Sequence, residues 1–297
     1  MQTRCPACQS RVIQSLFAVP DHEYNLDYQA QYAFCRECSS FFQSPMPDLI
    51  QLSHFYPANY HSFDINNILV QLKQRQRLRR LRSFVDSDAI TLLDYGCGSG
   101  VFIKESAKNM PHSKFYGYEI NSTDRKEVLA DGRVIILKGS LDYLLHELPV
   151  CDVITLNHVI EHVPDPLKVL SALHQKLKPN GVLEGQTPAA DSLEQGIFRK
   201  GWSGFHAPRH TVIFSKKGLM KILKRAGFSE CQITPAFNPA GIAISLATLP
   251  QGNSRGRISR KGLFWLFCVA LATFLYPVDL LSGAPGMINF SARHRMI

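Results

Sequence analysis

The stretch LLDYGCGSG, residues 92–100, decides the fold of this chain. The apolar run at residues 90–93 suits a strand that is covered on both faces, as in a parallel sheet. Gly96, Gly98 and Gly100 then permit a tight turn with close backbone approach, and residues 101–110 predict a helix. Such a turn directs bare backbone N–H groups at the helix N-terminus toward a ligand.

The glycine spacing argues against two phosphate-binding motifs. The dinucleotide pattern is G-x-G-x-x-G, whereas here the glycines stand at every second residue, and no Gly-Lys-Ser/Thr of a P-loop follows. Asp94 precedes the first glycine by two residues, so the turn favours a ligand with a cationic amino group. The D-x-G-x-G-x-G run resembles motif I of the class I S-adenosylmethionine-dependent methyltransferases from about residue 90 onward. This resemblance implies that Asp94 and the three glycines bind S-adenosylmethionine.

A second acidic residue stands where the ribose of that cofactor is bound. Residues 114–119 predict a strand that ends at Glu119, just before a polar helix start at Asn121, and a carboxylate there can accept both ribose hydroxyls. By the same resemblance Ser140 and Leu141 contact adenine, and Asn157 lies beside the cofactor.

The remaining strands alternate with helices. Strands are expected at 133–138, 150–157, 182–186 and 229–237, with a last, antiparallel strand at 287–296. The predicted fold is therefore α/β, a doubly wound seven-stranded mostly parallel sheet with a small N-terminal zinc module. We expect the methyltransferase domain at 90–297, with a C-terminal apolar helical insertion at about 240–285.

The N-terminal segment carries two C-x-x-C pairs. Cys5 and Cys8 form the first pair, and Cys35 and Cys38 form the second. Four thiolates from two such turns can bind one zinc ion tetrahedrally. A redox dithiol or two disulfides are the alternatives, which a reducing cytosol and the absence of a thioredoxin-like context disfavour. Residues 1–44 are therefore predicted to be a zinc-binding module. The other cysteines are expected in the core, namely Cys97, Cys151, Cys231 and Cys268.

Residues 45–89 are expected to form a connector and a basic helix. The connector is rich in aromatic residues and prolines, and residues 68–85 predict a helix with one apolar stripe. Its other face is basic, through Lys73, Arg75, Arg77, Arg79, Arg80 and Arg82. That face is either solvated or an anion-binding surface for RNA, pyrophosphate or lipid headgroups.

The segment LNHVIEHVPDP, residues 156–166, combines candidate chemistry at the end of the fourth strand. It resembles the corresponding motif of ubiquinone-biosynthetic O-methyltransferases, in which an acidic residue and a Glu-His pair are associated with a divalent metal. His158 stands in place of the first acidic residue, so metal binding is left open. We expect His158 to be a substrate-facing general base and His162 to be structural.

The long loop at residues 187–214 is expected to carry function. Trp202, His206 and Arg209 are the predicted substrate-binding residues, because they suit an anionic, partly apolar acceptor. His210 is a second candidate base. The segment resembles one found in bacterial methyltransferases of glycan and cell-surface biosynthesis. The alternative is that Arg209 holds this loop by hydrogen bonds.

The C-terminal part carries a basic cluster followed by an apolar run. The cluster comprises Arg255, Arg257, Arg260 and Lys261, and LFWLFCVALATFLY follows, fourteen residues without a charge before Pro277 and Asp279. This run is shorter than the roughly 20 residues of a bilayer span. A buried or dimer-forming helix and an interfacial membrane helix with a basic anchor both stay open.

Composition narrows the function only partly. The formal net charge of +9 suits nucleic acid, an anionic membrane or a phosphorylated substrate. A secretory signal is not recognised, so a cytoplasmic protein, peripheral at most at the inner face of a membrane, is expected. The sequence predicts an S-adenosylmethionine-dependent methyltransferase, with zinc, that acts on an O or C nucleophile of a small or lipid-linked acceptor, glycan-related or isoprenoid-related. An RNA-modifying methyltransferase and a non-catalytic binding module are the alternatives; no RNA-binding motif is recognised.

Overall fold

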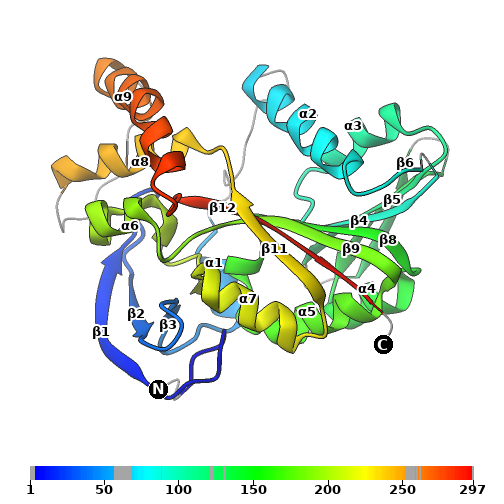
Figure 1. Ribbon diagram of the computed structural model, residues 1–297, viewed down its shortest axis with the longest axis horizontal. Coiled ribbons are helices and arrows are strands. Elements are labelled where there is room, and N and C mark those ends of the chain that lie inside the picture. Colours follow the sequence, from blue (N-terminus) through cyan, green and yellow to red (C-terminus); the bar gives the residue numbers. More distant parts are fainter. Residues whose placement is uncertain are drawn as a thin grey trace.

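The computed structural model describes residues 4–56, 68–87, 89–120, 124–129, 132–251, 258, 260 and 262–295. Two sheets organise these residues (Figure 1). The larger has eight strands in the order β11, β12, β9, β8, β4, β5, β7, β6. Their bounds are β4 (Thr91–Tyr95), β5 (Lys114–Ile120), β6 (Arg125–Leu129), β7 (Val134–Gly139), β8 (Cys151–Asn157), β9 (Leu177–Pro188), β11 (Ser229–Pro235) and β12 (Met287–Arg293).

The large sheet confirms the predicted α/β doubly wound class. Strands β7, β5, β4, β8 and β9 pair in parallel, and β12 is antiparallel to both β9 and β11, as expected for the last strand. Successive residues of β4 point to opposite faces, so Leu92 and Leu93 belong to two different core clusters. One face is covered by α2 (Ile68–Arg82) and α3 (Val101–Asn109), and the other by α4 (Leu141–Glu147), α5 (Pro166–Gln175) and α7 (Lys216–Arg225).

Three local expectations were wrong. The sheet has an eighth strand, because residues expected to continue a helix after Glu119 form β6, antiparallel to β7 at the edge; the helix start expected at Asn121 and Ser122 lies outside the described residues. Charged side chains such as Lys126 and Glu127 suit an exposed edge strand. The helix expected at 68–85 ends at Arg82, and Leu177 begins β9 rather than ending a helix.

The smaller sheet completes the N-terminal segment. It contains β1 (Ile13–Pro20), β2 (Gln29–Cys35), β3 (Phe41–Gln43) and β10 (Val212–Ile213), and α1 (Leu49–His54) follows it in the chain. Strand β10 comes from the long 187–214 segment and pairs with β3. Residues 1–44 therefore share a sheet with a part of the chain that lies about 170 residues away.

The long segment at 187–214 is not structureless. It contains α6 (Leu193–Phe198), the short helices η2 (Arg199–Gly201) and η3 (Ser203–Phe205), and β10. Two apolar helices, α8 (Pro239–Thr248) and α9 (Gly262–Leu281), lie between β11 and β12, with the short helix η4 (Leu249–Gln251) after α8. Figure 1 shows α9 standing out from the body beside α8.

The turn that connects α9 to β12 contacts two buried acidic residues, Glu194 and Asp279. Glu194 accepts a hydrogen bond from Trp202 Nε1 at 3.2 Å, and Asp279 accepts one from the Gly286 backbone N–H at 3.1 Å. Burial, together with the charge of Asp279, raises the pKa of Glu194 to about 7. The protonated form of Glu194 therefore suits the fold better than the ionised form.

We expect Glu194→Gln to stabilise the protein at alkaline pH. The pKa of Glu194 is about 7 in the folded protein, against the usual 4.5. Wild-type stability is therefore lost as the pH rises from 4.5 to about 7, by at most about 3 kcal/mol. Thermal unfolding at pH 5 and pH 8.5 measures the effect: the variant should unfold several degrees above wild type only at pH 8.5. Glu105→Gln removes the same charge from an exposed site and should show no such difference. Equal gains at both pH values would contradict the prediction.

Candidate functional site

The glycine turn stands at the carboxyl end of β4, where ligands bind in open α/β sheets. The backbone N–H groups of Gly96 and Cys97 both donate to Tyr118 O, at 2.8 and 2.9 Å. The three glycines have φ of +77°, +54° and +73°, a region that strongly favours glycine. A Cβ built on Gly98 would meet no atom of the described residues within 4 Å, so its α-carbon faces open space. The turn is thus fixed to the neighbouring strand but open on one side.

Asp94 is buried beneath this turn and is neutralised from the preceding helix. Its Oδ1 accepts hydrogen bonds from Thr155 Oγ1 and from Arg77 Nη2, the latter at 2.9 Å. Burial raises the pKa of Asp94, and the Arg77 guanidinium opposes the shift. The guanidinium lies 3.8 Å from the centroid of the Phe102 ring, and its buried Nε has no hydrogen-bond partner among the described residues. An anion-binding group therefore stands directly beside a cation-binding one.

Glu119 lies at the end of β5 on the same edge of the sheet. Its Oε2 accepts a hydrogen bond from the Gly98 N–H at 2.8 Å, which orients the carboxylate along the turn. Burial raises its pKa, and the Gly98 bond opposes this. The sequence-predicted pair of motif I and Glu119 is therefore brought together by the structure.

The predicted adenine residues lie at the start of α4. The Ser140 hydroxyl accepts a hydrogen bond from the Tyr143 N–H at 3.1 Å and so caps that helix. Leu141 is its first residue. Both follow β7, the strand next to β5, so they share the edge that carries Glu119. The hydroxyl of Ser140 already has a structural role.

Asn157 ends β8 and joins a second buried ion pair. Its Nδ2 lies 3.3 Å from Glu184 Oε1, and Arg80 Nε lies 3.2 Å from Glu184 Oε2. Burial raises the pKa of Glu184, and the charge of Arg80 opposes the shift. Asn157 therefore contacts a buried ion pair that is close enough to Asp94 and Arg77 to feel their charges.

His158 follows Asn157 in a left-handed conformation, with φ of +57°. Its Nε2 lies 3.5 Å from Lys73 Nζ, and its Nδ1 lies 3.7 Å from Glu161 Oε1. An ammonium can only donate, so Nε2 is the unprotonated nitrogen and the proton on Nδ1 faces the carboxylate. Burial and the Lys73 charge lower the pKa of His158, which is therefore neutral at pH 7.

Two more histidines, His162 and His210, lie close to Glu161, the carboxylate that His158 faces. The ligand atoms of Glu161, His162 and His210 all lie within 4.8 Å of one another, and such a donor set suits a divalent transition metal. His162 Nδ1 lies 2.9 Å from the Tyr56 hydroxyl. His210 is 7% exposed and donates from Nδ1 to Gly204 O; burial and the charge of His162 hold its pKa well below the usual range. His210 therefore has less access to an acceptor than His158.

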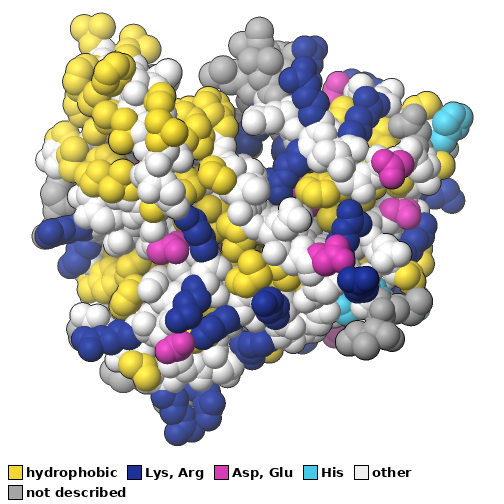
Figure 2. All heavy atoms as spheres, viewed as in Figure 1, with side chains coloured by type: hydrophobic (Ala, Val, Ile, Leu, Met, Phe, Trp, Pro, Cys, Tyr) yellow, Lys and Arg dark blue, Asp and Glu magenta, His cyan; other side chains and the backbone are white. Residues whose placement is uncertain are grey.

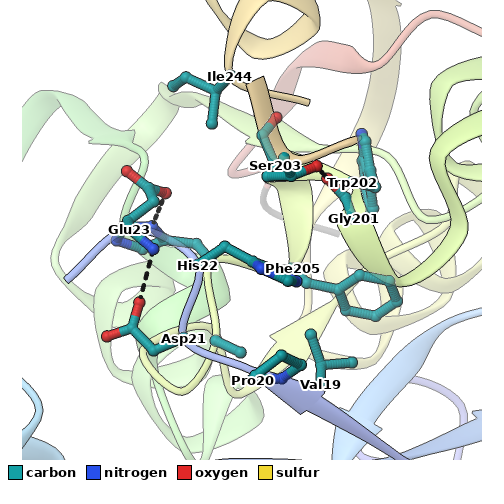
Figure 3. A pocket seen from close by; sticks show the side chains of 13 residues that line it. Val19, Pro20, Asp21, His22, Glu23, Gly201, Trp202, Ser203, Phe205 and Ile244 are labelled. Carbon is teal, nitrogen blue, oxygen red and sulfur yellow. Dashed lines mark hydrogen bonds and ion pairs between the residues drawn. The ribbon is translucent and has the colours of Figure 1, made fainter. Parts of the chain in front are cut away.

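Each predicted substrate-binding residue is paired with an acidic side chain, and Trp202 and Arg209 are buried. Arg209 is fully buried and donates to both oxygens of Asp21, at 2.8 and 3.1 Å. His206 bonds Glu23, and Trp202 bonds Glu194. Trp202 and His206 line a small pocket with the end of β1. Figure 3 shows Trp202 beside this pocket, with Val19 and Pro20 of β1. This placement favours structural hydrogen bonding by Arg209, the alternative reading of the sequence, over substrate binding.

The four N-terminal cysteines meet at one point. Their Sγ atoms all lie within 4.8 Å of one another, with Cys5 to Cys38 at 3.7 Å and Cys8 to Cys35 at 3.5 Å. A zinc tetrahedron with bonds of about 2.3 Å has S···S edges of about 3.8 Å, so these residues fit one zinc ion. All eight cysteines of the chain are free thiols.

The family profile described as a methyltransferase domain matches residues 59–232, more than half of the chain. The chain belongs to this methyltransferase-domain family. It is 26% identical over 148 residues to the malonyl-[acyl-carrier protein] O-methyltransferase of Halalkalibacterium halodurans, covering 46% of this chain and 55% of that protein. It is 33% identical over 102 residues to the ubiquinone biosynthesis O-methyltransferase of Pseudomonas paraeruginosa, covering 31% and 41%. The chain thus spans about half the length of the curated relatives it matches.

A solved structure extends the likeness over the whole fold. The phosphoethanolamine N-methyltransferase 2 of Haemonchus contortus, in complex with S-adenosyl-L-methionine, superposes with a TM-score of 0.53 at 14% identity. The match covers 96% of this chain and 69% of that one. At this identity the likeness establishes the fold of the methyltransferase domain.

Sequence reasoning missed the cations that complete the site. Helix α2 was expected to present its basic face to solvent or to a separate anion, but Arg77 and Arg80 turn toward Asp94 and Glu184 instead. The available signal was their spacing: these two arginines alternate with Leu78 and Leu81, which are buried against α3 and the sheet. Arg75, Arg79 and Arg82 stay exposed.

Proposed function

We propose that this protein is an S-adenosylmethionine-dependent methyltransferase that acts on an oxygen or carbon nucleophile of a small acceptor. The observation that carries the proposal is the set of opposite charges around the glycine turn. The amino-acid part of S-adenosylmethionine has one ammonium and one carboxylate, which match Asp94 and Arg77. Its ribose has two hydroxyls, which match Glu119 beside Gly98. Membership of the methyltransferase-domain family supports the same donor.

The proposed cofactor residues are those predicted from the sequence, with Arg77 added. They are Asp94, Gly96, Gly98, Gly100, Glu119, Ser140, Leu141 and Asn157. When bound, S-adenosylmethionine supplies a methyl group on a positively charged sulfur and leaves as S-adenosylhomocysteine. The protein's contribution is chiefly to hold the acceptor atom in line with that methyl group.

His158 is the proposed general base. Its unprotonated Nε2 removes the proton of the acceptor hydroxyl or carbon acid, and Glu161 stabilises the imidazolium that results. Lys73 lies beside Nε2 and favours negative charge that develops on an acceptor oxygen. His210 is the second candidate for this role, but its burial behind Glu161 makes it the weaker one.

The acceptor is proposed to be a small or lipid-linked molecule, glycan-related or isoprenoid-related. Both curated relatives are named as O-methyltransferases, which supports an oxygen acceptor over carbon. An RNA acceptor is less favoured, because Arg77 and Arg80 of the basic helix face inward. We also propose that Cys5, Cys8, Cys35 and Cys38 bind zinc, and that the protein works in the cytoplasm, where the thiols stay reduced.

We expect His158→Gln to lower turnover by about 10²- to 10⁴-fold while cofactor affinity stays unchanged. Release of S-adenosylhomocysteine in the presence of small phenols and hydroxylated sugars measures turnover. Because the pKa of His158 is lowered below its usual 6.5, wild-type kcat/KM should be flat above pH 6.5 and fall only at more acidic pH. Full activity in His158→Gln, or loss only in His210→Gln, would remove His158 from this role. Failure to turn over any acceptor with intact cofactor binding would favour the non-catalytic alternative.

A further inference from the structure

Helix α9 exposes an apolar side that no described residue covers. The residues on its buried stripe are Cys268, Ala272, Tyr276 and Asp279, spaced three or four apart, and the first three pack with residues of α8. On the opposite side the exposed fractions reach 86% at Leu263, 61% at Phe267, 79% at Phe274 and 87% at Leu281. At 100° per residue these four positions lie within about 40° of one another, so they form one apolar ridge along the helix. Figure 2 shows hydrophobic side chains gathered over α8 and α9.

The exposed side carries no charged residue over its whole length. Thr273 is its one hydroxyl among the described residues, and it donates to Val269 O at 2.9 Å, so its polar group is satisfied within the helix. An apolar patch of this extent on a protein surface marks an interaction site. The run is also longer than expected, because the helix continues through Pro277 and reaches 20 residues, long and apolar enough to cross a membrane.

Both ends of α9 are nevertheless attached to the same folded body. Before the helix, the Ile258 N–H donates to His22 O at 3.2 Å, and Arg260 pairs with Glu23. After the helix, Gly286 donates to Asp279, and β12 enters the central sheet at Met287. A spanning helix places its ends on opposite sides of a bilayer, so this geometry fits a helix that lies along a membrane surface.

Cations precede the helix in the sequence, and two more are exposed next to α8. The sequence places Arg255, Arg257, Arg260 and Lys261 directly before α9. Arg199 and Lys200 are exposed in η2, and Thr248 Oγ1 ties η2 to α8 by a hydrogen bond to Gly201 O at 2.7 Å. An apolar helix face with cations close by in the sequence and in η2 is complementary to a bilayer with anionic headgroups.

We propose that α9 seats the protein on an anionic lipid surface, with Phe267 and Phe274 among the residues that enter the acyl boundary. In a typical interfacial helix the second face is polar and faces water. Here that face is replaced by the packed body of the protein, through Cys268, Ala272 and Tyr276. The number of cations next to α9 in the sequence and in η2 favours an anionic lipid surface over a second copy of this chain, which carries the same positive charges.

Vesicle co-sedimentation of the full-length protein tests this proposal. Vesicles of phosphatidylcholine alone are compared with vesicles that also contain phosphatidylglycerol. We expect binding that is at least about tenfold stronger to the anionic vesicles. The variant Phe267→Gln with Phe274→Gln should lose at least about tenfold in binding, and so should Arg255→Gln with Arg257→Gln. Ile50→Gln with Val128→Gln changes two equally exposed apolar residues elsewhere and should bind like wild type.

Two results would overturn the proposal. The first is a protein that stays in the supernatant with both kinds of vesicle. The second is a phenylalanine variant that binds anionic vesicles as the wild type does. Concentration-dependent self-association without vesicle binding, lost in the same variant, would assign α9 to a dimer interface instead. Binding of S-adenosylhomocysteine is measured on each variant by calorimetry. A variant that loses vesicle binding but keeps this ligand tests the role of α9 alone, independently of the proposed methyl transfer.

Discussion

Replacing both Cys35 and Cys38 with serine is expected to release one zinc ion per chain and to unfold the N-terminal sheet. A structural Cys₄ zinc site contributes on the order of 10 kcal/mol to the folded state of a small module. Strands β1, β2 and β3 have too small a core to offset that loss. The effect should spread to α7, because Ser215, its N-cap, donates to Cys38 O and its N–H donates to Ser40 Oγ.

Metal analysis and amide hydrogen exchange measure this effect. The wild-type protein should hold one zinc per chain, and the double variant none, with fast exchange in residues 13–43 and at the start of α7. Cys231→Ser changes a half-buried cysteine that is not part of the four-cysteine cluster and should retain the metal. A wild-type protein that is stably folded without metal, or one with four oxidised cysteines, would contradict the zinc assignment.

Gly98→Val is expected to weaken cofactor binding by more than about 100-fold while the fold is retained. The φ of +54° imposes backbone strain of about 1–2 kcal/mol on a non-glycine residue, but the new side chain meets no described atom within 4 Å. It therefore occupies the open side of the turn, where the ligand is proposed to lie. Loss of binding would come from this steric block rather than from unfolding.

Gly132→Val is the matched control. Gly132 also has a positive φ, +75°, and a Cβ there would meet no atom of the described residues within 4 Å. It precedes β7, at the opposite end of the parallel strands from the turn. The control should show the same small loss of thermal stability and unchanged cofactor affinity. Wild-type affinity in Gly98→Val would show that the ligand does not occupy the space above this glycine.

The parts of the fold that sequence predicted best depend on local chemistry. The alternate glycines force the turn after β4, and the acidic end of β5 follows from a short apolar strand, so Gly98 and Glu119 meet as expected. The two C-x-x-C knuckles likewise predict a four-cysteine cluster, because each pair is local and the metal needs both. Such features leave a recognisable pattern within a few residues.

The parts that sequence missed depend on distant partners. Arg77 was one of six basic residues expected either to be solvated or to bind an anion, and only the packing of α2 against α3 turns it toward Asp94. Strand β10 has two residues, too few for a periodic pattern, and its pairing with β3 is set by tertiary structure. The sequence left two roles open for Arg209, and its bidentate contact with Asp21, which favours the structural role, is set by tertiary structure. The length of α9 was underestimated because Pro277 was expected to stop the helix.

Titration calorimetry of the purified full-length protein tests the central claim most directly. S-adenosylmethionine and S-adenosylhomocysteine should each bind at one site per chain. Affinity should fall in Gly98→Val and be kept in Gly132→Val. No heat of binding with either ligand, from a folded protein with its zinc in place, would contradict the assignment of this site to S-adenosylmethionine.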